Sequence, residues 1–298
     1  MSDLPARVAQ RLPSLFLQTL PQFEPLWKRM VGAVAASNAS PQVVLDLASG
    51  AGEPAFGLAR RFPNAEVVAS DHDAGMLSIA QQRIDAEFAS PPGRVAAHQI
   101  DLLSLPALAE AQSGLAADVV TCSLGLFMLP REAQAPCLRG IHAILTPGGH
   151  LCASVWEDER VPMMELGGRC LAAALGQPTP PPLPFDPASL GGGRADAPLA
   201  AAGFSVASCA EHNATGELRL ALGAAGSDDA FMVGLLPFMG ALGEIERTAP
   251  ERRAFERARD AFDAHVAEGE HAAVDAATGQ VVLAPMRYRL LSVLKAGG

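Results

Sequence analysis

One stretch constrains the fold of this chain more than any other: LDLASGAGEP, residues 45–54. Its apolar start predicts a strand, and Gly50 and Gly52 allow the backbone to turn sharply. Helical spacing follows over residues 54–62, and Pro54 suits a first helical turn because its missing N–H has no partner there in any case. A glycine turn between a strand and a helix lets a ligand lie against the main chain and the helix N-terminus. The stretch therefore predicts a βαβ unit with a ligand site at the turn.

The rest of the sequence extends this pattern into an α/β fold. Short apolar runs alternate with helical stretches, which predicts a doubly wound, mostly parallel sheet of seven strands. The predicted strands cover residues 43–45, 66–69, 95–100, 118–123, 149–156, 203–207 and 286–294, and the clearest helices cover 54–62, 74–88 and 131–145.

Three consecutive segments are expected. Residues 1–40 form an N-terminal helical lid, in which Pro21 and Pro25 break or kink the helix. Residues 41–156 form the α/β core. Residues 157–298 hold the end of the sheet and helical insertions for substrate recognition, including a helical insertion over 211–284 before the last strand.

Charge and composition exclude several classes of protein. The 298 residues carry a net charge of −10, and Lys28 and Lys295 are the only lysines, which argues against a nucleic-acid-binding protein. No apolar run reaches the roughly 18 to 20 residues of a membrane span. The five cysteines have no spacing typical of a disulfide framework or a metal site, so we expect reduced thiols, no metal and a cytoplasmic protein. One chain's sequence gives no oligomeric state.

Three acidic residues at predicted strand ends suggest what the turn binds. Asp71 follows Gly52 by 19 residues and can accept hydrogen bonds from ribose hydroxyls. This spacing also fits an NAD(P)-dependent oxidoreductase. Asp46 would repel a pyrophosphate but attract an amino group, directly or through water, and Asp101 could accept from an adenine amine. Asp46 and Asp101 thus favour an adenosine cofactor with an amino-acid moiety.

Together with the helix end ILTPGG at 144–149, these residues resemble the class I S-adenosylmethionine-dependent methyltransferases, over about residues 42–156. The resemblance is strongest to the small-molecule group that includes the ubiquinone and menaquinone C-methyltransferases. It implies S-adenosylmethionine as cofactor and S-adenosylhomocysteine as product. One position departs from the family, because Ala48 stands where a glycine is usual. The implied cofactor residues are Asp46, Ala48, Ser49, Gly50, Gly52, Asp71, His72, Met76, Asp101, Leu102 and Ser123.

The resemblance further implies in-line transfer of a methyl group to a small acceptor. Few basic residues and an apolar N-terminal segment favour an uncharged or partly hydrophobic acceptor, with carbon, nitrogen, oxygen and sulfur all open. A non-catalytic S-adenosylmethionine-binding protein is the other alternative. No general base is selected by the sequence. The candidate acceptor residues are Phe16, Trp27, Phe127 and Trp156, and the candidate bases are His212, Glu157 and His265.

Overall fold

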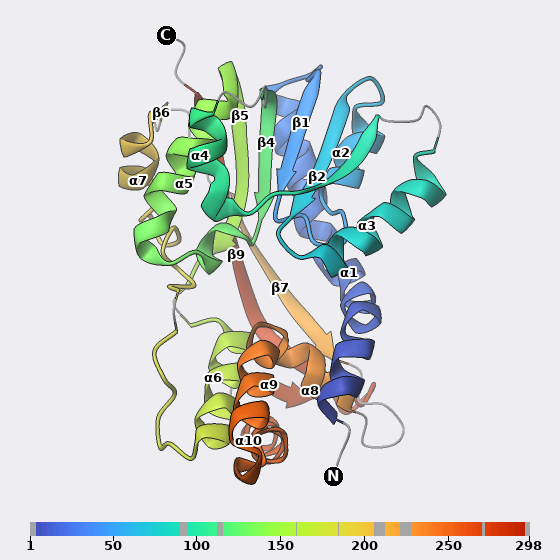
Figure 1. Cartoon of the computed structure of the whole chain (residues 1–298), viewed down its shortest axis with the longest axis vertical. Coiled ribbons are helices and arrows are strands. Elements are labelled where there is room, and N and C mark those ends of the chain that lie inside the picture. Colours follow the sequence, from blue (N-terminus) through green and yellow to red (C-terminus); the bar gives the residue numbers. More distant parts are fainter. Residues whose placement is uncertain are drawn as a thin grey trace. The chain divides into compact units, whose positions relative to one another are not determined.

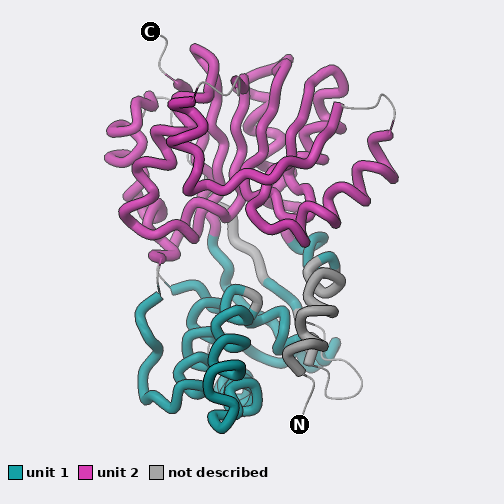
Figure 2. The backbone as a smooth tube through the Cα atoms, in the orientation of Figure 1, with its two compact units in different colours: residues 1–22, 160–183, 215–287 teal, residues 23–159, 184–214, 288–298 magenta. Residues whose placement is uncertain are grey.

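The computed structural model describes residues 4–89, 94–111, 116–158, 160–183, 185–205, 212–220, 228–269 and 272–295 (Figure 1). Within these ranges, the side chains of residues 4–16, 18, 212–217, 220, 228–229 and 236 are outside the description. The chain divides into two compact units (Figure 2): unit 1 comprises 1–22, 160–183 and 215–287, and unit 2 comprises 23–159, 184–214 and 288–298. Each unit combines segments far apart in sequence, and the division into three consecutive segments stays a prediction.

The strands form one mixed sheet in the order β3-β2-β1-β4-β5-β9-β6, with β7 and β8 also paired to β9. The pairs among β1 to β5 are parallel, and β9 is antiparallel to β5, β6 and β8. The predicted α/β class with a mostly parallel sheet is therefore confirmed. The strands are β1 (Val43–Leu47), β2 (Glu66–Asp71), β3 (Val95–Gln99), β4 (Ala117–Ser123), β5 (Leu145–Trp156), β6 (Phe204–Ser205), β7 (His212–Leu220), β8 (Ala272–Val274) and β9 (Val281–Lys295).

The prediction of seven strands is wrong, because the sheet has nine among the described residues. The two extra strands, β7 and β8, lie inside the insertion that was expected to be helical. β7 has the sequence HNATGELRL, which contains no apolar run, and β8 has three residues. Both pair with β9, which begins at Val281 instead of 286. Such strands form because a partner backbone is present, which no local hydrophobic pattern reveals.

Helices cover both faces of the sheet in unit 2. One buried cluster joins Leu45 and Leu47 to α4, α5 and α7, and the other joins Val44 to α1, α2 and α3. This alternation follows from the two-residue period of a strand. The α-helices are α1 (Leu4–Ser37), α2 (Ala55–Arg61), α3 (Ala74–Glu87), α4 (Leu105–Glu110), α5 (Arg131–Ile144), α6 (Pro162–Leu175), α7 (Asp196–Ala201), α8 (Asp228–Gly234), α9 (Met239–Thr248) and α10 (Ala254–Glu268). The 3-10 turns are η1 (Leu102–Ser104), η2 (Leu126–Met128), η4 (Leu236–Phe238) and η5 (Pro250–Arg252).

The N-terminal helix is not broken at Pro21 or Pro25, where the sequence predicts a break or a kink. α1 is assigned as one helix from Leu4 to Ser37. Beyond Pro25, its residues Leu26, Met30 and Val34 are at most 4% exposed, and the last two join the cluster beneath α2. Burial of these three side chains stabilises the helix and offsets the destabilising effect of the prolines within it.

Unit 1 has its own packing around α6 and α10. The Phe231 and Phe262 rings meet edge to face at 5.7 Å, and the Phe238 ring packs directly on Gly167 of α6.

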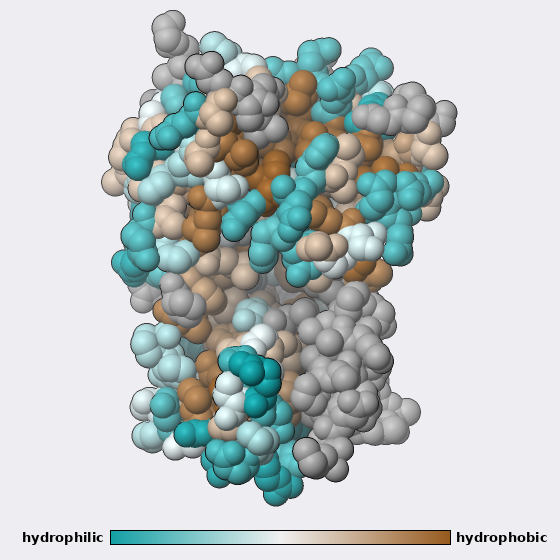
Figure 3. All heavy atoms as spheres, viewed as in Figure 1, coloured by the Kyte–Doolittle hydropathy of each residue, from teal (hydrophilic) through white to brown (hydrophobic). Residues whose placement is uncertain are grey.

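Figure 3 shows apolar residues among polar ones on one face of the molecule. In the described part of the chain, no helix is long and apolar enough to cross a bilayer.

Candidate functional site

The turn after β1 has the strained backbone that its glycines predict. Ala48, Gly50 and Gly52 have φ values of 52°, 54° and 108°. Glycine is required at position 52 for two reasons: its φ is strained for a residue with a Cβ, and a Cβ there would lie 2.3 Å from the ring of Phe56. The Ser49 carbonyl accepts the N–H groups of Gly52 at 2.9 Å and of Glu53 at 3.2 Å, and the Ser49 N–H donates to the Ser70 carbonyl at 2.8 Å. The turn is thus fixed to the end of β2.

Asp71 joins the glycine turn to β2, whose last residue it is. Its Oδ2 accepts the Gly50 N–H at 2.9 Å, and its Oδ1 accepts the Asp73 N–H at 3.0 Å. His72 lies beside it, with Nδ1 3.2 Å from Asp71 Oδ1 and an exposed side chain. Each carboxylate oxygen has two lone pairs, so Asp71 keeps acceptor capacity for a ligand hydroxyl. The structure therefore brings together the turn and the acidic residue expected from spacing.

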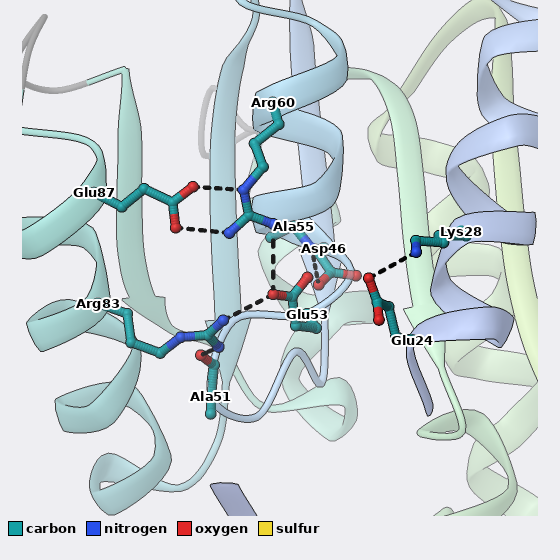
Figure 4. A network of polar contacts seen from close by, with 9 residues as sticks. All are labelled: Glu24, Lys28, Asp46, Ala51, Glu53, Ala55, Arg60, Arg83 and Glu87. Atoms are coloured by element: carbon teal, nitrogen blue, oxygen red, sulfur yellow. Dashed lines mark hydrogen bonds and ion pairs between the residues drawn. The ribbon is translucent and has the colours of Figure 1, made fainter. Parts of the chain in front are cut away.

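Asp46 lies beneath the turn and is fully buried (Figure 4). Its Oδ1 accepts a hydrogen bond from the Thr121 hydroxyl at 2.5 Å, and its Oδ2 accepts one from the Ala55 N–H at 3.1 Å. The second bond fixes the first residue of α2. Burial, more than any neighbouring charge, raises the pKa of Asp46 to about 8. A positive charge nearby would favour its ionised form.

Thr121 was missed by the sequence analysis. Its signal is a hydroxyl residue inside an otherwise apolar strand, which takes the position beside Asp46 in the β1–β4 register. Ser49 is also buried, and its Oγ has no hydrogen-bond partner among the described residues. Such an unmet hydroxyl beside a glycine turn can bond to a ligand.

The predicted adenine-side residues follow β2 and β3, which are neighbours in the sheet. The Met76 N–H donates to Asp73 Oδ1 at 2.7 Å, so it belongs to the capped first turn of α3. Asp101 is exposed and caps η1, where Oδ1 accepts the Leu103 N–H at 2.9 Å, and Leu102 is the first residue of that turn. Both segments begin at carboxyl ends of parallel strands, where open α/β sheets bind ligands.

The segment after β4 lies against the glycine turn. A Cβ at Gly125 would lie 2.6 Å from the Cβ of Ala48, so the two backbones are in close contact. Ser123 Oγ is 3.1 Å from Ser154 Oγ and accepts the indole N–H of Trp27 at 3.2 Å. Trp27 of α1 and Ser123 are thereby brought together, although they are 96 residues apart.

Three of the expected acceptor residues, Trp27, Phe127 and Trp156, belong to a continuous aromatic group within unit 2. We call this group the aromatic belt: Phe185, Phe127, Trp156, Tyr288, Phe23 and Trp27. Successive ring centroids in that order are 5.7, 6.0, 4.9, 6.4 and 6.0 Å apart. The side chain of the fourth expected residue, Phe16, lies outside the described residues. The belt contains both tryptophans and the single tyrosine of the sequence.

The three candidate bases have different surroundings. Glu157 binds Arg289 with both oxygens, one of them at 2.7 Å from Nη2. His265 is buried on α10 of unit 1, 3.5 Å from Glu268, and burial lowers its pKa. The side chain of His212 lies outside the described residues. A role for any of these three as a base stays a prediction.

Comparison with known proteins agrees with this geometry. Residues 44–149 match the family model of a methyltransferase domain. A demethylmenaquinone methyltransferase of Deinococcus radiodurans is 34% identical over 125 residues, which cover 42% of this chain and 47% of that protein. The matched region thus spans about half the length of this curated relative.

Two solved structures extend the likeness in fold. The YcgJ protein of Bacillus subtilis has a TM-score of 0.52 at 13% identity and covers 91% of this chain and 100% of its own. The magnesium protoporphyrin IX methyltransferase of Synechocystis, solved with S-adenosylhomocysteine, has a TM-score of 0.50 at 15% identity and covers 93% of this chain and 85% of its own. The two solved structures share the fold, and the family match together with the strand order and the glycine turn places a methyltransferase domain in this chain, as the resemblance to the class I S-adenosylmethionine-dependent methyltransferases predicted.

Proposed function

We propose that this chain binds S-adenosylmethionine at the carboxyl ends of β1, β2 and β4 and transfers its methyl group to a small acceptor. The observation that carries the proposal is the contact between Asp71 Oδ2 and the Gly50 N–H at 2.9 Å. This contact sets a ribose-binding carboxylate against a turn whose backbone a ligand can approach closely. The match of residues 44–149 to a methyltransferase domain supports this choice over a nicotinamide cofactor.

The described residues fit such a ligand in chemical character. Asp71 would accept the ribose hydroxyls, and Met76 and Asp101 would meet the adenine. The unpartnered Ser49 hydroxyl would meet the amino-acid end, whose positively charged amino group suits a site above Asp46. Asp46 would act through the turn, since both of its oxygens already accept hydrogen bonds from the protein.

When bound, S-adenosylmethionine would supply an activated methyl group on a positively charged sulfur, for transfer to an electron pair of the acceptor, and S-adenosylhomocysteine would keep the electron pair of the broken carbon–sulfur bond. The chain's task is then to hold the acceptor in line and to exclude water. Ser123, the last residue of β4, bonds Trp27 and Ser154 and is placed to line that end of the site. A proton released from the acceptor would leave to a base that we do not assign.

The aromatic belt supports an uncharged, partly hydrophobic or aromatic acceptor. Phe127, Trp156 and Tyr288 are at most 7% exposed, and the Trp156 indole N–H has no hydrogen-bond partner among the described residues. A flat ligand with an oxygen acceptor would match such surroundings. The name of the Deinococcus radiodurans relative, a demethylmenaquinone methyltransferase, suggests a quinone-like compound as the first to try.

The test is transfer of an isotope-labelled methyl group from S-adenosylmethionine to a panel of phenols, quinols, amines and thiols. We expect labelled product with an aromatic acceptor and stoichiometric S-adenosylhomocysteine. A protein that binds S-adenosylhomocysteine but methylates no member of the panel would support the non-catalytic alternative instead. A protein that binds neither sulfur compound would contradict the proposed function at its first step.

A further inference from the structure

Arg83 of α3 makes three contacts at or beside the glycine turn, of which Figure 4 shows the two with Ala51 and Glu53. Its Nη1 donates to the Ala51 carbonyl at 2.5 Å, and its Nη2 donates to Glu53 Oε1 at 2.8 Å. Its guanidinium carbon also lies 4.7 Å from the centroid of the Phe56 ring. The planar fork of arginine suits such simultaneous contacts, which a lysine ammonium would not reproduce.

The ring under Arg83 is itself part of the turn's support. Phe56 is fully buried and packs so closely on Gly52 that a Cβ there would be 2.3 Å away. The Arg83 guanidinium thus packs on the Phe56 ring, and that ring packs on Gly52. Arg83 also donates a hydrogen bond to the carbonyl of Ala51, the residue next to Gly52. The side chains of Arg83 and Glu53 are 28% and 12% exposed, so their ion pair is partly shielded from water.

The position of Arg83 on α3 makes its contacts with the turn relevant to cofactor binding. α3 begins at Ala74, directly after Asp73, whose side chain caps the helix, and three residues after Asp71. Asp71 bonds the turn at Gly50, and Arg83 bonds the same turn at Ala51 from the later part of α3. The turn is therefore held at two successive residues, at Gly50 by Asp71 at the end of β2 and at Ala51 by Arg83 of α3.

We propose that Arg83 is a positioning residue that fixes the turn at residues 48–54 in the shape needed to bind the cofactor. The inference rests on the proposed function, because it concerns the affinity of that same site. Preorganised sites bind more tightly, since ordering the loop does not then oppose binding. Loss of Arg83 should therefore weaken binding although Arg83 does not touch the ligand.

A matched control lies on the same two helices. Arg60 of α2 binds Glu87 of α3, with Nη2 2.6 Å from Oε2, and thus also links α2 to α3. Among the described residues, Glu87 has no hydrogen bond or ion pair with the turn. Glu87→Gln removes the negative charge of this ion pair but leaves the contacts of Arg83 to Ala51 and Glu53 in place.

The experiment measures the dissociation constant of S-adenosylhomocysteine for the full chain and for Arg83→Gln, Arg83→Lys and Glu87→Gln, with thermal unfolding of each. Charged hydrogen bonds of this kind predict about a tenfold loss of affinity in Arg83→Gln. Arg83→Lys should recover part of it, and Glu87→Gln should bind as the wild type does. Equal affinity of Arg83→Gln and the wild type, or an equal loss in Arg83→Gln and Glu87→Gln, would overturn the positioning role.

Hydrogen exchange of the ligand-free proteins separates this inference from the proposed function. We expect faster exchange of the amides of Gly50, Gly52 and Glu53 in Arg83→Gln but not in Glu87→Gln. Unchanged exchange in Arg83→Gln would overturn the inference even if the cofactor binds. If the wild type binds no S-adenosylhomocysteine, the proposed function fails and with it the role in binding.

Discussion

At the scale of single residues, Ala48 and Gly125 form a compensating pair. Ala48 has a φ of 52°, a left-handed conformation in which residues with a Cβ are strained. Its methyl group is accommodated because Gly125 has none: a Cβ at Gly125 would lie 2.6 Å from the Ala48 Cβ and 2.8 Å from Cys122 Sγ. The alanine that departs from the family pattern is therefore matched by a glycine in the segment after β4.

This pairing predicts energetic coupling between the two positions. Gly125→Ala should lower the free energy of unfolding by about 1 to 3 kcal/mol, because the added methyl group overpacks a closed contact. In an Ala48→Gly background the same change should cost less, with the Cys122 contact left as the remaining clash. Denaturant unfolding of both single variants and the double variant checks this cycle. Additive effects would mean that the two residues do not compete for one space.

The sequence predicted this part of the site unevenly. Gly50, Gly52 and Asp71 could be predicted because their roles depend on backbone freedom and on strand-end spacing, both of which are local. Thr121 and Arg83 could not, since Thr121 meets Asp46 through strand register and Arg83 reaches Ala51 across 32 residues. The role of a partner on another element is a property of the tertiary fold.

At the scale of elements, the pairing of β5 with β9 contains a buried histidine. His150 of β5 is 1% exposed, and its Nε2 lies 2.7 Å from the Ser292 hydroxyl oxygen of β9. Burial depresses the pKa of His150 from 6.5 to about 4. In the folded chain this imidazole therefore stays neutral at pH values where the unfolded chain binds a proton.

The sign of the pH effect follows from that depressed pKa. The stabilising contribution is complete above about pH 6.5 and is lost as the pH falls towards 4, by up to about 3 kcal/mol. Chemical unfolding of the wild type and of His150→Gln between pH 4 and 7 measures it. The variant should lose less stability over this range, while parallel profiles would show that His150 does not carry the effect.

The elements themselves were predictable to different extents. β1, β2, β4 and α2 follow from hydrophobic pattern and turn residues, so their positions agree with the prediction within two or three residues. β7 and β8 do not, because strands without an apolar run depend on β9 for their hydrogen bonds. The sequence predicts a break or a kink in α1 because proline acts locally, whereas burial of Met30 and Val34 acts through tertiary packing.

At the scale of the whole molecule, the proposed cofactor residues all belong to unit 2. Packing changes inside unit 1 should therefore leave cofactor affinity unaltered. Gly167→Ala would place a Cβ 2.1 Å from the Phe238 ring, within unit 1, at a cost of about 1 to 3 kcal/mol. We expect a lower unfolding midpoint with a dissociation constant for S-adenosylhomocysteine that changes by less than about twofold.

Gly243→Ala is the matched control, because nothing lies within 4 Å of a Cβ there. It should keep the wild-type midpoint or raise it, since alanine favours a helix over glycine. Loss of S-adenosylhomocysteine binding in Gly167→Ala, at a temperature where that variant is folded, would show that the site depends on unit 1.

The most direct measurement is calorimetric titration of the wild type, Asp71→Asn and Asp85→Asn with S-adenosylmethionine, S-adenosylhomocysteine and NAD. Asp85 is an exposed residue of α3 bonded to Gln81, so its amide variant controls for the loss of one charge. The wild type and Asp85→Asn should bind both sulfur compounds and not NAD, and Asp71→Asn should bind them about ten- to a hundredfold more weakly. Binding of NAD alone, or undiminished binding by Asp71→Asn, would contradict the cofactor site described for this chain.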